Sequence, residues 1–390
     1  MPTATYRAAD FVAAAATLGV EVVVGSEQRQ TLADAMGDRA VVIPFDDVEA
    51  GATAIRALHD RAPVDAIVAL DDQGVVVGAT ASEQLGLPHN PPSAAASTRD
   101  KAAMRRALAA AGVRQPRFAS FDDVKRVPDV GFPCVVKPVG LSASRGVIRA
   151  DDRRQAAAAA RRASAIAGGG TMLVEEYVPG DEVAVEALLR AGRLEVLAVF
   201  DKPDPLVGPY FEETIYVTPS RLAPHVLADV QRAAADAATA LGLREGPVHA
   251  EVRIHDDEAW VIEVAARSIG GLCSRALRFG AGISLEEVIL RHALGLPLDD
   301  LTRETAASGV MMLPIPRRGV LDAVHGRDAA RSTPGIVGLE ITVPLGHSVE
   351  PLPEGDRYLG FLFARAADPA RVEAALRSAY AELDVEINDD

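Results

Sequence analysis

The sequence predicts a multidomain protein of mixed class, α/β at its N-terminus and α+β beyond it. The chain has 390 residues, which is enough for two or three domains. In residues 1–90, short apolar strands alternate with helices, a pattern typical of a parallel sheet. Between Gly246 and Gly271, two alternating segments flank a short polar turn, which indicates a β-hairpin.

The composition is that of an ordinary globular protein with an excess of acidic residues. The net charge of −15 argues against a polyanionic partner such as DNA, because phosphate binding at long range needs positive charge. Cys134 and Cys273 are too few for a disulfide framework or a thiolate metal site. No apolar run approaches a membrane helix, and Asp10 interrupts the start of the one signal-like segment, Phe11–Val20. We therefore expect a cytoplasmic protein without nucleic-acid or membrane partners.

Residues 1–90 are expected to form the first domain, and the turn-rich segment Gly86–Pro92 marks its end. The expected elements are a helix at Ala8–Leu18, strands at Glu21–Gly25 and Val41–Phe45, a helix at Asp47–Arg61, and a strand at Ala66–Leu70 that runs into Asp71-Asp72. A sheet of this type ordinarily opens with a hydrophobic strand, yet only Met1–Thr5 precede the first helix.

Residues 91–305 are expected to form the central domain, with a small lobe at about 120–200 and a second lobe at about 201–305. The expected helices are Arg99–Ala111, Asp152–Ala167 and Pro224–Leu241, and the expected strands are Cys134–Pro138, Val147–Arg149, Met172–Val178, Glu182–Leu189 and Leu194–Phe200. The small-residue loop Gly140–Gly146 lets backbone N–H groups approach phosphates and can close as a flap. By itself such a loop is more often a simple hairpin turn, because its spacing matches neither common nucleotide-binding fingerprint.

In the hairpin, a turn centred on Asp257 places Glu251 directly opposite Glu263, with Cβ atoms about 5 Å apart. This register puts Val261, Glu263 and Arg267 on one face. Two like charges at that distance destabilise a sheet unless a cation or a proton lies between them. Hard oxygen ligands of this kind suit Mg²⁺. The alternative is an exposed hairpin face with two unrelated carboxylates.

Residues 306–390 are expected to form a small α+β cap. An amphipathic helix at Leu285–Leu294 precedes it. Within it we expect strands at Gly309–Ile315 and Leu359–Ala364 and a final helix at Pro369–Leu383, separated by a region of short strands punctuated by glycines.

Several motifs occur together in a characteristic order: Lys101, the Val-Val-Lys137-Pro strand, the Gly/Ser loop, Glu175–Val178, and the hairpin that carries Glu251 and Glu263. Their order and spacing over about residues 90–300 resemble the ATP-grasp superfamily. The resemblance implies an ATP-grasp fold with an N-terminal Rossmann-like domain and a C-terminal cap. EVAARSIGG and DKPDPLVGPYFEET look most like the carboxylate–amine ligases of the L-amino acid ligase type.

The resemblance implies that one group of residues binds ATP. The group comprises Lys101, Lys137, Ser142, Ser144, Gly146, Glu175, Glu176, Val178 and Glu182. The two lysines would contact the phosphates, Glu175 would accept from the adenine amino group, and the backbone of Glu176 and Val178 would read the ring edge. Glu182 would bind the ribose hydroxyls, and the Gly140–Gly146 loop would cover the triphosphate.

The resemblance also implies that Glu251 and Glu263 hold Mg²⁺, with Mn²⁺ as an alternative, and that Arg267 stabilises the acyl phosphate and its transition state. Many members of the superfamily have an Asn two residues after the second metal Glu, where this chain has Ala265. His249 faces Ala265 across the hairpin in the derived register. His249 or water fills that ligand position, or His249 is an ordinary histidine on a sheet face.

Family placement puts a further group near the substrate pocket, although each member can equally be structural. It comprises Tyr210, Glu213, Tyr216, Ser268, Gly270, Gly271 and Arg275. The activity implied is ATP-dependent ligation of an amino acid carboxylate to an amine through an acyl phosphate, with release of ADP and phosphate. Enzymes of this type are often homodimers. The alternatives are a biotin-carboxylase-like or formyl-type ligase on the same fold, and an inactive nucleotide-binding regulatory protein.

Overall fold

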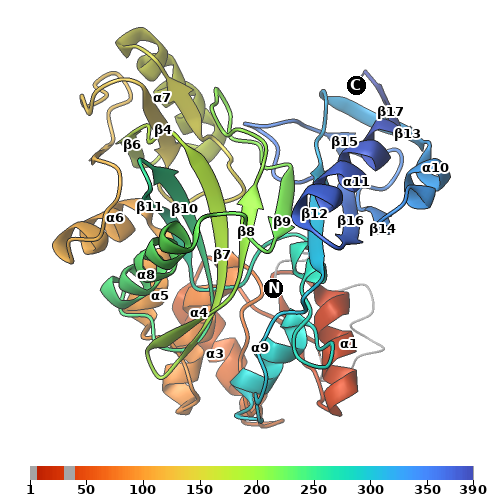
Figure 1. Cartoon of the computed structure of the whole chain (residues 1–390). Helices are drawn as coiled ribbons and strands as arrows, with labels where there is room; N and C mark the ends of the chain where they lie inside the picture. Colours follow the sequence, from red (N-terminus) through yellow and green to blue (C-terminus); the bar gives the residue numbers. More distant parts are fainter. Residues whose placement is uncertain (1–6, 30–39, 390) are drawn as a thin grey trace.

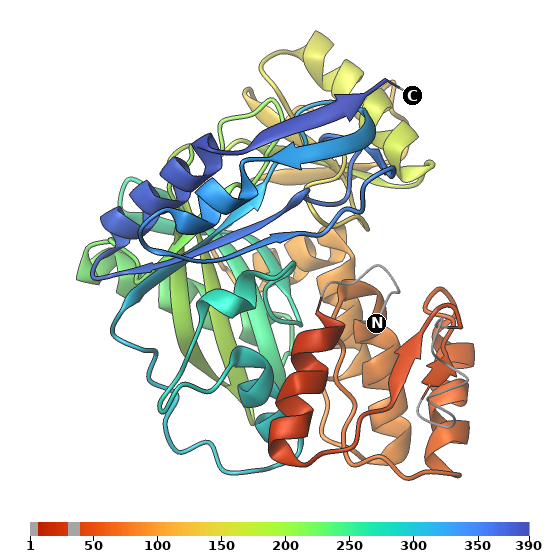
Figure 2. The ribbon, with the colours of Figure 1, turned by 90° about the vertical axis from the view of Figure 1, so that its right-hand side faces the viewer.

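The computed structural model describes residues 7–29 and 40–389 (Figure 1). The expected opening strand at Met1–Thr5 lies outside these residues. The strands form two large sheets and two small ones, and the helix α1 (Ala8–Leu18) lies beside the helix α9 (Leu285–Ala293) low in the molecule (Figures 1 and 2). No helix in the described part of the chain is long and apolar enough to cross a lipid bilayer.

The N-terminal region is an α/β unit whose described sheet is small. Its elements are α1 (Ala8–Leu18), β1 (Val24–Ser26), β2 (Ala40–Val42), α3 (Val48–His59) and α4 (Asp72–Leu85). The strands β1 and β2 are parallel, as the alternating pattern predicts. The strand expected at Ala66–Leu70 is wrong for the described residues, because this segment joins no ladder there and runs directly into α4.

A four-stranded sheet of order β3-β6-β4-β5 forms the upper lobe in Figure 1. Its strands are β3 (Phe118–Phe121), β4 (Cys134–Pro138), β5 (Ile148–Ala150) and β6 (Met172–Glu176). The alanine-rich helix α7 (Arg153–Ala167) packs on one face, where Ala156, Ala159, Ala160 and Ala163 are buried against the sheet. Small side chains let this helix approach the strands closely. The helices α5 (Pro92–Arg99) and α6 (Lys101–Ala110) lead into this lobe.

An eight-stranded sheet of order β11-β10-β7-β8-β9-β12-β16-β14 forms the centre of the molecule. Its strands are β7 (Asp181–Arg190), β8 (Arg193–Lys202), β9 (Ile215–Thr218), β10 (Gly246–His255), β11 (Glu258–Ala265), β12 (Ala307–Leu313), β14 (Ile336–Ile341) and β16 (Gly360–Ala366). The last three come from the C-terminal region, which therefore extends the central sheet. The strand β12 joins these three strands to the rest of the sheet by pairing with β9.

Both faces of this sheet carry apolar side chains that are covered by helices. Neighbouring residues of a strand point to opposite faces. Val183, Val185 and Val199 pack toward α8 (Pro224–Ala240). Ala184 and Phe200 pack toward α9 (Leu285–Ala293) and the short helix η2 (Cys273–Ala276). The helix α11 (Pro369–Ala381) covers the C-terminal strands. The C-terminal end of the chain also contains a three-stranded sheet and a short helix, α10 (Arg327–Ser332). The strands of this sheet are β13 (Gly319–His325), β15 (Ser348–Val349) and β17 (Asp384–Asn388).

The β10–β11 hairpin has the expected register at its open end and a different one near its turn. Glu251 pairs with Glu263, as predicted, but Val252 pairs with Val261, so that Ile262 forms a β-bulge. The bulge moves Val261 into the core with Val264, and its expected place on the face of Glu263 is wrong. The turn has two residues, Asp256 and Asp257, both with positive φ, the geometry of a tight hairpin.

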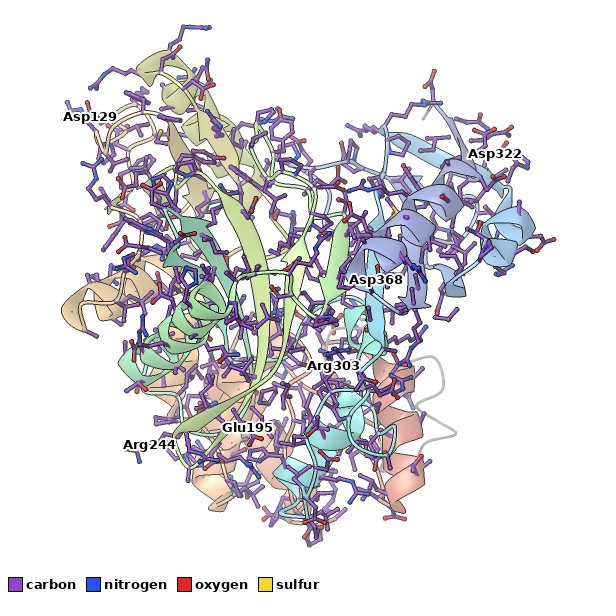
Figure 3. The ribbon with its side chains drawn as sticks, viewed as in Figure 1. Asp129, Glu195, Arg244, Arg303, Asp322 and Asp368 are labelled. Carbon is purple, nitrogen blue, oxygen red and sulfur yellow. The ribbon has the colours of Figure 1, made fainter. Side chains whose placement is uncertain are left out.

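Contacts between distant segments hold the upper lobe to the C-terminal region. Arg162 on α7 forms a two-point ion pair with Glu354, with Nε–Oε1 and Nη2–Oε2 distances of 2.6 and 2.9 Å. The Gly146 N–H donates to the carbonyl of Pro353 at 3.0 Å. Figure 3 shows the exposed Asp129 and Asp322 at the outer tips of these two regions, away from their contact.

Candidate active site

A cavity of about 420 Å³ lies where the four-stranded sheet, the eight-stranded sheet and the N-terminal region meet. This volume is typical of a site for a small-molecule ligand. Its walls come from the start of α4, the start of α6, the Gly140–Val147 loop, the end of β6, the β10–β11 hairpin and residues 356–358. Lys101, Lys137, Glu251, Glu263 and Arg267 all line it. The hairpin face predicted from the sequence is therefore a cavity wall.

Each of the two opposed hairpin carboxylates is compensated by a different lysine. Glu263 Oε1 lies 3.0 Å from Lys101 Nζ, at the start of α6. Glu251 Oε1 lies 3.6 Å from Lys202 Nζ and 3.6 Å from His249 Nε2. Burial alone would raise the pKa of Glu251, but Lys202 and His249 hold it well below its usual range. Glu251 and Glu263 both line the cavity, and this pair of hard oxygen donors fits a divalent cation.

A second buried charge cluster lies at the end of β6. Glu175 accepts from Arg105 Nε at 2.5 Å through one oxygen and from Lys137 Nζ at 2.7 Å through the other. Burial would raise the pKa of Glu175, but these two cations lower it to about 2. Arg105 also donates to the carbonyls of Val261 and Ile262 at 2.9 and 2.6 Å, which fixes the bulge. Sequence reasoning missed Arg105 because its partners lie 70 to 157 residues away.

The segment expected to read an adenine edge is partly occupied by protein contacts. The Glu176 N–H donates to the carbonyl of Arg117 at 2.9 Å, and the Val178 carbonyl accepts from Arg253 at 2.7 Å. Both residues line the cavity. An adenine ring edge would therefore have to contact backbone groups of this segment other than the Glu176 N–H and the Val178 carbonyl, which are already hydrogen-bonded.

The small-residue loop forms one wall of the cavity, as a flap would. Ser142 and Ser144 line the cavity, and the Leu141 carbonyl accepts from Lys101 Nζ at 2.6 Å. Gly146, which the resemblance places in the nucleotide site, does not line the cavity, and its N–H is bonded to Pro353. The loop thus contributes its serine end to the cavity.

Glu182, expected at the ribose, belongs to a group of three carboxylates. Its oxygens accept from Lys202 Nζ at 2.7 Å and from Arg253 Nε at 2.8 Å. Oxygens of Glu182, Glu213 and Glu251 lie within 4.8 Å of one another, and Lys202 contacts all three residues. Lys202 itself is buried beneath the cavity floor, and its three partners raise its pKa well above the usual value despite burial. No local sequence pattern indicates this role of Lys202.

Arg267 is held by a carboxylate from the N-terminal region. Its Nε and Nη2 donate to the two oxygens of Asp72 at 3.1 and 3.0 Å, and its Nη1 donates to the Ser268 carbonyl at 3.0 Å. Burial opposes the charge on Asp72, but Arg267 lowers the pKa of Asp72 to about 2. A guanidinium has five N–H groups, so two of those on Arg267 remain for a ligand. Asp72 was not identified from the sequence, because only the tertiary fold brings α4 to this hairpin.

His249 occupies the position expected beside Ala265, and its ring is already bonded. Its Nδ1 lies 2.5 Å from Glu186 Oε1, and Glu186 Oε2 accepts from the Ile269 N–H at 2.9 Å. Burial favours neutral His249, but Glu186 raises its pKa to about 9. His249 therefore connects Glu251 to the loop that follows Arg267. Its Nε2 faces Glu251, and its Nδ1 contacts Glu186, which accepts from the Ile269 N–H.

The residues expected at the substrate end divide into two groups. Glu213, Tyr216, Gly270 and Gly271 line the cavity. Ser268, Arg275 and Tyr210 do not. Ser268 is buried behind the wall, Arg275 pairs with Asp10 and Glu340, and Tyr210 bonds to Arg162. The expectation that these three residues face the substrate is not met by the geometry.

Comparison with known proteins gives three family matches along the chain. Residues 130–276 match an ATP-grasp domain, residues 12–89 an ATP-grasp N-terminal domain, and residues 311–388 the L-amino acid ligase C-terminal domain 2. An L-amino acid ligase structure from Bacillus licheniformis superposes with a TM-score of 0.81 at 26% identity and covers 97% of this chain and 96% of that one.

Two curated relatives are named for different reactions. Alanine–anticapsin ligase of Bacillus subtilis is 28% identical over 254 residues, 58% of this chain and 53% of the relative, so the match spans about half of that relative's length. Formate-dependent phosphoribosylglycinamide formyltransferase of Geobacter metallireducens is 29% identical over 337 residues, 83% of this chain and 82% of the relative.

Removing the buried Lys202 charge tests the three-carboxylate group. We expect Lys202→Met to lower the free energy of unfolding by about 3–5 kcal/mol, because buried carboxylates lose their common counter-charge. Urea unfolding measures this value. Lys125→Met, at an exposed lysine, is the matched control and should stay within about 0.5 kcal/mol of wild type. Equal effects of the two changes would contradict the arrangement.

The Asp72 pair yields a prediction with a defined pH dependence. The pKa of folded Asp72 lies below its unfolded value, so its ionisation stabilises the fold above about pH 4 and this is lost as the pH falls toward 2. We expect Asp72→Asn to cost about 2 kcal/mol or more of unfolding free energy at pH 7. The difference from wild type, measured by urea unfolding, should be constant between pH 8 and 5 and shrink below pH 4. A difference that grows in acid would refute the assignment.

Proposed function

Because the chain belongs to the ATP-grasp superfamily and its C-terminal region matches L-amino acid ligases, we propose that it is an ATP-dependent carboxylate–amine ligase. It would activate an amino acid carboxylate as an acyl phosphate and join it to an amine, with release of ADP and phosphate. The observation that carries this proposal is one cavity shared by two opposed carboxylates, two buried lysines and the Asp72-held Arg267.

The nucleotide would lie along the β4–β6 side of the cavity. Glu175–Val178 would contact the base, and Glu182, which lines the same cavity, would bind the ribose. Lys101 and Lys137, both buried cations on the wall, would bind phosphate oxygens. Ser142 and Ser144 would cover the triphosphate from the loop. Each lysine already contacts a carboxylate, which keeps its ammonium group in place before the ligand arrives.

Glu251 and Glu263 would hold Mg²⁺, which supplies positive charge at the phosphate oxygens. A carboxylate alone is a poor acyl donor because its leaving group would be oxide. Transfer of the γ-phosphoryl group to the carboxylate oxygen supplies a phosphate leaving group, and the lysines stabilise charge on the transferred oxygens. The amine then attacks the acyl carbon, where the two free N–H groups of Arg267 would bind the oxyanion. The loop excludes water that would hydrolyse the intermediate.

A formyl-type ligase is the second candidate, because the formyltransferase relative matches 82% of its own length. The C-terminal match to L-amino acid ligases favours the first candidate. ADP formation separates the two. We expect ADP release to require an added amino acid pair. Release that requires formate and phosphoribosylglycinamide would instead support the formyl-type reaction, and release that requires bicarbonate a carboxylase. Mass analysis of the product identifies the bond that is formed.

Glu263→Gln tests the metal-binding role. It removes one anionic oxygen from the cavity, so we expect the rate of ADP formation to fall about 100-fold or more with the fold retained. Glu258→Gln on the same strand is the control, because Glu258 is exposed at the turn and pairs with Arg114. Circular dichroism checks that both variants are folded. ADP formation by folded Glu263→Gln within threefold of wild type would exclude this role.

A further inference from the structure

One end of the cavity is built from buried, largely apolar side chains that the proposed reaction does not use. This apolar end is formed by Tyr216, Ile269, Cys273, Met312 and Tyr358, all of which line the cavity. The first four belong to the core between the central sheet, α9 and η2, and Tyr358 packs against that core. The segments proposed to contact the nucleotide come instead from β4, β6 and the Gly140–Val147 loop. The apolar end is therefore available to a substrate.

The central sheet and η2 form the base of the apolar end. Tyr216 on β9 pairs with Val310 on β12, so Met312, two residues further along, points to the same face of the sheet. Cys273 on η2 packs on this face, and its Sγ lies 3.7 Å from Met312 Sδ. Met312 and Cys273 are each 2% exposed. The contact between these two side chains closes the cavity at this point and limits the length of a group that enters it.

The apolar end begins beside Glu251, one of the two carboxylates proposed to hold the cation. Lys202 Nζ lies 3.6 Å from Glu251 Oε1 and 5.2 Å from the centre of the Tyr216 ring. Glu213, which also contacts Lys202, has an oxygen within 4.8 Å of one on Glu251. The carboxylate that is phosphorylated has to lie by the cation. The amino acid that carries this carboxylate can therefore extend its side chain into the apolar end.

The ionisable groups at the apolar end are uncharged or already paired. Burial raises the pKa of Tyr216, Tyr358 and Cys273, and the charge of Glu213 raises each of them further. Glu213 itself contacts the Lys202 ammonium group. A charged substrate side chain would lose hydration among these neutral groups, whereas an apolar side chain gains free energy by burial. The composition of the apolar end therefore favours an apolar side chain.

We propose that the apolar end binds the side chain of the donor amino acid and that Met312 limits its length, so that the enzyme activates amino acids with apolar side chains in preference to charged ones. This inference rests on the proposed ligase function and names the donor class for the same site. Glu213 and the hydroxyl groups of Tyr216 and Tyr358 would bind the α-ammonium group of that donor. The structural alternative is that Met312 and Cys273 only complete the core between the sheet and η2.

The experiment replaces the acceptor amine by hydroxylamine, so that the donor is tested alone. The hydroxylamine nitrogen bonds to the acyl carbon of the acyl phosphate as the carbon–oxygen bond to phosphate breaks, which gives a hydroxamate and free phosphate. The donors form a linear series, alanine, aminobutyrate, norvaline, norleucine and aminoheptanoate, with glutamate and lysine as charged comparisons. For the wild-type enzyme we expect kcat/KM to rise about fourfold with each added methylene group up to a maximum. The values for glutamate and lysine should be about 100-fold or more below that maximum.

Two neighbouring methionines of β12 provide the variant and its matched control. Met312→Ala should move the maximum of the series toward longer side chains, because it removes the atoms that close the apolar end. Met311 points to the opposite face of the strand and is buried in the core beneath α11. Met311→Ala should therefore keep the wild-type maximum. Circular dichroism and urea unfolding check that both variants are folded.

Four outcomes would overturn the inference. They are a wild-type enzyme that uses glutamate or lysine as well as the best apolar donor, a flat response to side-chain length, an unchanged maximum in folded Met312→Ala, and the same shift in Met311→Ala. The wild-type series remains decisive if the variants do not fold. The two levels are separable: no hydroxamate with any amino acid refutes the ligase, whereas hydroxamate without the preference for apolar donors refutes only the role of the apolar end.

Discussion

The register of the β10–β11 hairpin makes Glu251 and Glu263 direct neighbours, and the rest of the site depends on this constraint. Opposed like charges destabilise a ladder, so the chain has to supply positive charge from elsewhere. Lys101 brings the start of α6 to Glu263, and Lys202 brings the end of β8 beneath Glu251. The two lysines come from different elements, α6 and β8. Charge compensation therefore joins separate parts of the chain at the place where an anionic nucleotide and a cation would bind.

Charged pairs connect the regions at other places too, in addition to the apolar contacts that they share. Asp72 of the N-terminal region holds Arg267, and Arg162 of the upper lobe holds Glu354 of the C-terminal region. Arg275 bonds both Asp10 of α1 and Glu340 of β14. Paired charges carry directional hydrogen bonds, so these contacts fix orientation as well as proximity. A reaction that requires a carboxylate, a phosphate and an amine to meet needs this kind of fixed arrangement.

Local sequence patterns predicted those parts of the fold that local forces determine. The bounds of α1 and β4 agree with the prediction, and so does the pairing of Glu251 with Glu263, because periodicity and turn residues suffice there. The bulge at Ile262 was not predictable, since Arg105 fixes it from 157 residues away. The roles of Asp72 and Lys202 were not predictable either, because their partners are also distant in the sequence. The family resemblance predicts Arg275 at the substrate, and its sequence neighbours do not show that the distant Asp10 and Glu340 pair with it.

We propose that the opposed hairpin carboxylates, rather than the neighbouring group of Glu182, Glu213 and Glu251, hold the cation. Crystals grown with Mn²⁺ and a non-hydrolysable ATP analogue test this directly, because anomalous scattering identifies the position of the metal by itself. The account predicts an anomalous peak within about 2.5 Å of oxygens from both Glu251 and Glu263, beside the analogue's phosphates. A peak bound by Glu182 and Glu213 without Glu263, or an analogue bound away from Lys137, would contradict it.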